Sequence, residues 1–89
     1  FPIYLWQTQF TKIIDWWVLR LQLASKYYHL YRLDHVVGLF RIWAFPQDKP
    51  AKEGRFIPEE ENLWIPNGTR VLQAFLEKCP MLPIAEDLG

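Results

Sequence analysis

Two short apolar runs, each ending in an acidic residue, flank an amphipathic segment in the second half of the chain. LYRLD (30–34) and MLPIAE (81–86) are too short for helices, whereas GTRVLQAFLEK (68–78) has its apolar residues at helical spacing. A strand–helix–strand crossover joins parallel strands, so this order predicts an α/β fold. Neither run shows the regular polar alternation of a half-exposed strand, which favours a sheet covered on both faces.

The remaining segments predict a first helix and a long loop. Residues 11–28 carry apolar side chains around most of a helical circumference, so we expect this helix to be largely covered. Residues 36–45 predict a short helix that ends before Pro46. Residues 47–68 are rich in Pro, Gly and charge and predict a long loop. The two apolar stripes of the first helix are Ile13, Trp17, Leu21, Ala24 and Tyr28, and Trp16, Leu19, Leu23 and Tyr27. The candidate caps of the second helix are Asn67 and Thr69, and its stripe is Val71, Leu72, Phe75 and Leu76.

Charge and composition narrow the classes of function. Ten basic and ten acidic residues are scattered along the 89-residue chain, so no basic stripe favours binding to nucleic acid. No apolar run approaches the roughly 20 residues of a transmembrane helix, so we expect no membrane partner. The single cysteine, Cys79, excludes an internal disulfide and favours a cytoplasmic location. The length allows at most one small domain.

The two acids at the strand ends are the candidate catalytic residues. Active sites of α/β sheets and barrels lie at the carboxyl ends of the strands, where Asp34 and Glu86 occur. Alternation places Arg32 on the same face as Asp34, and it selects Glu86 rather than Asp87 as the inward acid. Adjacent strands lie about 4.8 Å apart, close to the roughly 5 Å between the two carboxyl groups of retaining glycosidases. The spacing therefore favours a double-displacement mechanism.

Each of these residues also has a purely structural interpretation. Asp34 is of the type that commonly forms a turn after a strand, and Arg32 is then its ion-pair partner. His35 is explained equally well as a packing residue. The local sequence alone leaves these alternatives open.

Longer motifs add a resemblance to a known family. YRLDHVVGLFRIWAFP (31–46), EGRF (53–56) and LPIAEDLG (82–89) resemble the amylomaltases, the 4-alpha-glucanotransferases of glycoside hydrolase family 77. The resemblance implies strands four and five of a (β/α)8 TIM barrel, with the order helix, strand four, long loop, helix, strand five. Residues 1–89 are then a central fragment of the catalytic domain, truncated at both ends. Further matching positions are Pro2, Tyr4, Trp6, Trp16, Trp17 and Arg20.

The resemblance also implies roles for four residues. Asp34 matches the nucleophile and Glu86 the general acid/base, while Arg32 and His35 match substrate-binding residues. The implied reaction transfers α-1,4-glucan segments to the 4-hydroxyl of another glucan or of glucose, without a cofactor or metal. The expected partner is a maltooligosaccharide, within starch, glycogen or maltose metabolism.

Two alternatives to this function remain. The first is that the chain is a fragment of an α-amylase-type hydrolase. The second is that it is a non-catalytic module for glucan binding or protein interaction. One departure from the family pattern is Ala44, where many relatives carry Glu. The isolated chain is expected to be inactive, because two strands cannot close a barrel.

Overall fold

The predicted parallel pairing organises the structure. The computed structural model describes residues 3–86, and its strands β1 (Leu30–Leu33) and β4 (Leu82–Ala85) pair in parallel. Their register sets Leu30 opposite Leu82 and Leu33 opposite Ala85. The α/β class and the crossover between these strands are confirmed.

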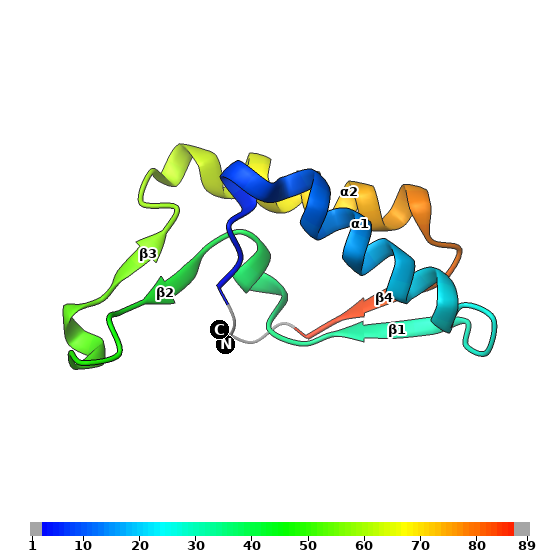
Figure 1. Cartoon of the computed structure of the whole chain (residues 1–89), viewed down its shortest axis with the longest axis horizontal. Helices are drawn as coiled ribbons and strands as arrows, with labels where there is room; N and C mark the ends of the chain where they lie inside the picture. The colour runs from blue at the N-terminus through cyan, green and yellow to red at the C-terminus, as the bar shows by residue number, and fades with distance from the viewer. Residues whose placement is uncertain (1–2, 87–89) are drawn as a thin grey trace.

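Helices α1 (Trp6–Ala24) and α2 (Trp64–Lys78) lie together over one face of this sheet (Figure 1). Their contact is the core: Ile14 and Val18 of α1 meet Val71 and Phe75 of α2, and all four are buried. Burying side chains of this size contributes about 1.5 to 3 kcal/mol each, so the helix pair is the main apolar support for the sheet.

Helix α1 differs from its predicted limits and buried face. It begins at Trp6 rather than Thr11, and the backbone of Gln9 leaves helical geometry at φ −124° and ψ 22°. This kink interrupts the helical spacing of the apolar residues, which explains why that spacing is recognisable in the sequence only after Gln9. The helix ends at Ala24, so the pattern that continues to Tyr28 extends past its end.

The buried stripe of α1 is shifted from the predicted one. Ile14 and Val18 are buried, while Trp17 and Leu21 pack partly against them. The second predicted stripe is largely exposed, with Leu19 at 57% and Tyr27 at 80%. Because apolar residues occur on every side of this helix, the sequence does not show which side packs against the rest of the protein. Within residues 3–86 no helix is long and apolar enough to cross a membrane.

The predicted loop and the short helix before it contain a β-hairpin. A 3₁₀ helix covers only Val36–Leu39, and β2 (Ile42–Ala44) then pairs antiparallel with β3 (Arg55–Ile57). The prediction of helix through residue 45 and of irregular chain at 47–68 is therefore wrong. The hairpin extends away from the β1–β4 end of the molecule (Figure 1). Two further 3₁₀ turns, Ala51–Glu53 and Glu61–Leu63, flank β3.

Helix α2 begins earlier than predicted, at Trp64. Asn67 and Thr69 therefore lie inside the helix and cap nothing. Pro66 is accommodated because it lies in the first turn, where backbone N–H groups have no partner within the helix. Gly68 is buried, and a β-carbon there would overlap the Phe40 ring.

This contact predicts the effect of replacing Gly68 by Ala. In an open helix the change would stabilise by about 0.5 to 1 kcal/mol, because Ala favours helix. Here the added methyl displaces the Phe40 ring, and we expect a loss of about 1 to 3 kcal/mol. Urea unfolding of the full-length protein measures this change in the free energy of unfolding. Gln73→Ala, on the exposed face of α2, is the control. An unchanged or raised unfolding midpoint for Gly68→Ala would contradict this packing.

Candidate active site

Asp34 and Glu86 occupy matching positions just past the ends of β1 and β4. The register that pairs Leu33 with Ala85 makes positions 34 and 86 the next pair. The backbone N–H of Glu86 donates to the carbonyl of Leu33 at 2.9 Å, which extends the parallel ladder to this point. The two acids therefore lie at the same, carboxyl edge of the sheet.

A single arginine joins the two carboxylates. Nε of Arg32 lies 2.5 Å from Oδ1 of Asp34, and Nη2 lies 3.1 Å from Oε1 of Glu86. The hydrogen bond and charge of Asp34, together with the charge of Glu86, raise the pKa of Arg32 above its usual value. The guanidinium thus stays protonated and holds both acids beside one cation.

The two carboxylates differ in their surroundings. The side chain of Asp34 is 69% exposed, and no hydrogen bond within residues 3–86 reaches its Oδ2. The side chain of Glu86 is only 23% exposed, and its Oε2 accepts a hydrogen bond of 2.7 Å from the backbone N–H of His35. Within residues 3–86, Asp34 therefore presents one oxygen that no donor reaches, whereas each oxygen of Glu86 accepts a hydrogen bond.

His35 contributes through its backbone as well as its ring. It is the one residue other than glycine with positive φ in the described chain, at φ 52° and ψ 50°. This left-handed conformation is uncommon for residues other than glycine, and it occurs two residues past the end of β1. The turn directs the His35 N–H at Glu86. Sequence reasoning assigned His35 a sugar contact and did not foresee this bond.

Gly38 makes room for the imidazole. A β-carbon at this position would lie 2.8 Å from Nδ1 of His35. The N–H of Gly38 also donates to the His35 carbonyl at 2.9 Å, which closes the turn. Sequence reasoning gave Gly38 no role, although a glycine three residues after His35 is a recognisable signal for close approach.

A cavity of about 250 Å³ lies beside Asp34 and His35. Tyr4, from the segment before α1, lines it together with Trp17 of α1. The other lining residues are Leu33, Val36, Gly38, Leu39 and Ile42. Tyr4 was noted in the sequence only as part of a motif, and the structure places it next to the candidate acids. Among residues 3–86, no three His, Cys, Asp or Glu side chains lie close enough together to hold a metal ion.

The contact between Glu86 and His35 generates a test by hydrogen exchange. Hydrogen bonds to charged groups contribute about 1.5 to 3 kcal/mol, so Glu86→Ala should accelerate exchange of the His35 amide by about tenfold or more. Asp34→Ala is the matched control, because Asp34 does not accept from this amide. Both are measured by NMR on the full-length protein. Equal protection in Glu86→Ala and the unmodified protein would rule out the contact.

Comparison with known proteins identifies the family to which the chain belongs. The sequence profile of glycoside hydrolase family 77, described as 4-alpha-glucanotransferase, matches residues 1–89. A 4-alpha-glucanotransferase of Chlamydia muridarum is 44% identical over 99% of this chain, which covers 16% of that relative. The Thermus thermophilus enzyme is 32% identical over 99% of the chain, covering 17% of its length. The chloroplastic/amyloplastic enzyme of Solanum tuberosum is also 32% identical over 99% of the chain, covering 14%. The chain spans about a sixth of the length of these relatives, and it belongs to the 4-alpha-glucanotransferase family, glycoside hydrolase family 77.

Proposed function

We propose that this chain carries the acid pair of a retaining 4-alpha-glucanotransferase acting on α-1,4-glucans. The observation that carries the proposal is the arrangement of Asp34 and Glu86 on one guanidinium at the carboxyl edge of two adjacent parallel strands. Family membership supports the transfer reaction and the glucan substrate. The proposed partner is a maltooligosaccharide, within starch, glycogen or maltose metabolism.

In the first step Asp34 is the nucleophile. Its open oxygen attacks the anomeric carbon of the donor sugar, and the bond from that carbon to the 4-oxygen of the next sugar breaks. Glu86 gives its proton to this leaving oxygen, which departs as a hydroxyl. The product is a glucosyl ester on Asp34. The guanidinium of Arg32 donates to Oδ1 of Asp34, so it orients the reacting carboxylate and balances its negative charge.

In the second step Glu86 is the base. It accepts the proton of an acceptor 4-hydroxyl, whose oxygen attacks the anomeric carbon and releases Asp34 as a carboxylate. The observed contacts match this stage, since donors from Arg32 and His35 reach both oxygens of Glu86. Each carboxyl oxygen has two lone pairs, so for the first step Glu86 can carry its proton on a lone pair that neither donor uses. Water in place of the sugar hydroxyl gives hydrolysis.

His35 also has a proposed role in substrate binding. Its ring lies beside the cavity that Asp34 lines, held next to Gly38. A neutral or protonated imidazole in this position can donate a hydrogen bond to a sugar hydroxyl. Arg32 is the second proposed substrate-binding residue, since its guanidinium lies at the same edge.

The proposed parent fold is a (β/α)8 barrel, in which β1 and β4 are strands four and five. The sheet face that carries Arg32 is uncovered, and its apolar residues Leu30, Leu82 and Ile84 are all more than half exposed. A barrel requires such a face to meet the side chains of further strands. Residues 1–89 are accordingly proposed as a central part of the catalytic domain.

The two alternatives predict different behaviour. An α-amylase-type hydrolase consumes water and releases one new reducing end per bond cleaved, whereas a transferase conserves the number of reducing ends. A non-catalytic glucan-binding module binds without turnover. The names of the relatives favour transfer, and an acid pair joined by Arg32 has no evident use in a binding module.

A cytoplasmic location is also proposed. It rests on the single cysteine, Cys79, which is free and buried. The potato relative is named chloroplastic/amyloplastic, which makes the plastid the competing location. Cell fractionation with detection of the full-length protein separates the two.

The acid pair is tested by substitution in the full-length protein. Asp34→Asn and Glu86→Gln should each lower the conversion of maltotriose into glucose and longer maltooligosaccharides by about 10³-fold or more. Chromatography of the products together with a reducing-end assay measures transfer and hydrolysis separately. Asp15→Asn, an exposed acid on α1, is the matched control and should retain activity. Retention of more than about a tenth of the activity in Asp34→Asn would exclude this residue as the nucleophile.

The barrel proposal predicts the behaviour of residues 1–89 expressed alone. The exposed apolar face and unpaired strand edges should cause self-association, and no glucose should be released from maltotriose. Light scattering and a glucose assay measure the two effects. A monomeric, active 89-residue chain would show that the sheet needs no further strands.

A further inference from the structure

We propose that one face of the β2–β3 hairpin binds the part of the glucan that extends beyond the sugar at Asp34. This inference rests on the proposed function and deepens it, because it names residues that recognise a long substrate. We define the groove face by Ile42 and Ala44 of β2 with Arg55 and Ile57 of β3. In the antiparallel register Ile42 lies opposite Ile57, and Ala44 opposite Arg55, so these side chains share one face.

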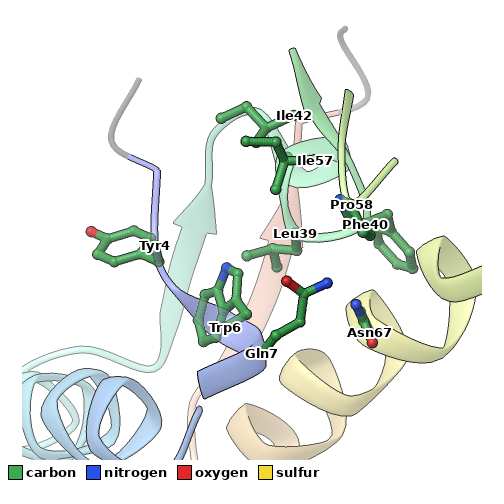
Figure 2. A pocket seen from close by; sticks show the side chains of 10 residues that line it. Tyr4, Trp6, Gln7, Leu39, Phe40, Ile42, Ile57, Pro58 and Asn67 are labelled. Atoms are coloured by element: carbon green, nitrogen blue, oxygen red, sulfur yellow. The ribbon is translucent and has the colours of Figure 1, made fainter. Parts of the chain in front are cut away.

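Three neighbouring cavities follow this face away from Asp34. The cavity beside Asp34 shares Tyr4 and Ile42 with a smaller one of about 40 Å³. Figure 2 shows this smaller cavity, with Trp6 on one side and Ile42 and Ile57 on the other, and Tyr4 also lines it. A third cavity, of about 250 Å³, shares Ile57 with the second. Each cavity has lining residues in common with the next, so the three lie in series along the hairpin, and we infer that a glucan follows this path.

The length of the path indicates an oligosaccharide. From Ile42 to Phe45 the chain advances three residues, or about 10 Å in extended conformation, which exceeds a single sugar ring. A glucan cleaved at Asp34 therefore needs several sugars to reach the far cavity. Short substrates do not extend that far.

The lining of the third cavity suits a neutral sugar. Phe45, just past the end of β2, is 47% exposed and offers an apolar ring against which the C–H face of a pyranose can pack. Arg55 and Glu53 line the same cavity and supply a donor and an acceptor for hydroxyl groups. Nε of Arg55 is held by Oε1 of Glu59 at 2.8 Å, which fixes the guanidinium and leaves its other nitrogens for a ligand. The acids offset the charge of Arg55, so an anionic ligand is not favoured.

The opposite face of the hairpin is already engaged within the chain. Trp43 packs edge-on against Phe56 at 5.0 Å, and its Nε1 donates to the carbonyl of Ala51 at 2.8 Å. Phe56 in turn contacts Trp64 of α2 at 5.3 Å, and Arg41 stacks over its ring at 4.4 Å. These contacts attach the hairpin to α2. On the groove face Arg55 is exposed, and the other three residues are partly exposed, so a ligand can reach this face.

Calorimetry on full-length protein carrying Asp34→Asn tests the proposal, because binding is then measured without turnover. The probes are maltotriose and maltoheptaose. Phe45→Ala should lower the ratio of the maltoheptaose to the maltotriose association constant about tenfold, equivalent to about 1.4 kcal/mol. Arg55→Ala should also lower this ratio of association constants. Phe45→Tyr keeps the ring and should restore the ratio, whereas Phe45→Leu should not.

Lys52→Ala is the matched control, an exposed residue on the same hairpin that does not line the cavity. An unchanged ratio in Phe45→Ala, or rescue by Phe45→Leu, would overturn the subsite. Because binding is measured without turnover, failure of the subsite and failure of the proposed reaction can be distinguished. A parent protein without transfer activity whose Phe45→Ala variant selectively loses maltoheptaose would retain the subsite and lose the proposed function. Conversely, a parent protein that has transfer activity but shows an unchanged ratio in Phe45→Ala would retain the proposed function and lose the subsite.

Discussion

The ion pairs of Arg32 are the interaction on which the candidate site depends. The guanidinium contacts Asp34 of its own strand end and Glu86 of the neighbouring one. Two carboxylates held on one guanidinium repel each other, and the cation between them offsets that repulsion. The arrangement holds only if β1 and β4 are parallel neighbours in the observed register. The remainder of the fold serves to keep that register.

The two acids are distinguished by geometry rather than by residue type. Asp34 is exposed with one oxygen open, and Glu86 is less exposed and receives donors at both oxygens. The second donor to Glu86 exists because His35 adopts positive φ, and Gly38 leaves space for the His35 ring. A short turn after β1 thus connects the strand of the proposed nucleophile, Asp34, to the proposed general acid/base, Glu86. This division of roles is the basis of the proposed double displacement.

The sequence predicted the parts that depend on local pattern and strand order. The parallel strands and the positions of Asp34 and Glu86 at one edge follow from apolar runs separated by a helix. The β2–β3 hairpin was missed because each strand has only three residues, too few for alternation to show. The start of α2 was misplaced because Pro66 and Gly68 are typical of loops. Pro66 is tolerated in the first turn of the helix, and Gly68 is explained by its packing on Phe40. The left-handed turn at His35 depends on tertiary contacts that no local pattern records.

The most direct measurement of the central claim is the trapping of the glucosyl ester. A glucosyl fluoride loses fluoride without needing a proton, so a full-length Glu86→Gln variant should form the ester and release it slowly. Digestion and mass spectrometry then locate the added sugar. The account predicts a hexose on the peptide that contains Asp34, attached through its carboxylate. A stable adduct on a different residue, or none under conditions where fluoride is released, would contradict the pairing of Asp34 as nucleophile with Glu86 as acid/base.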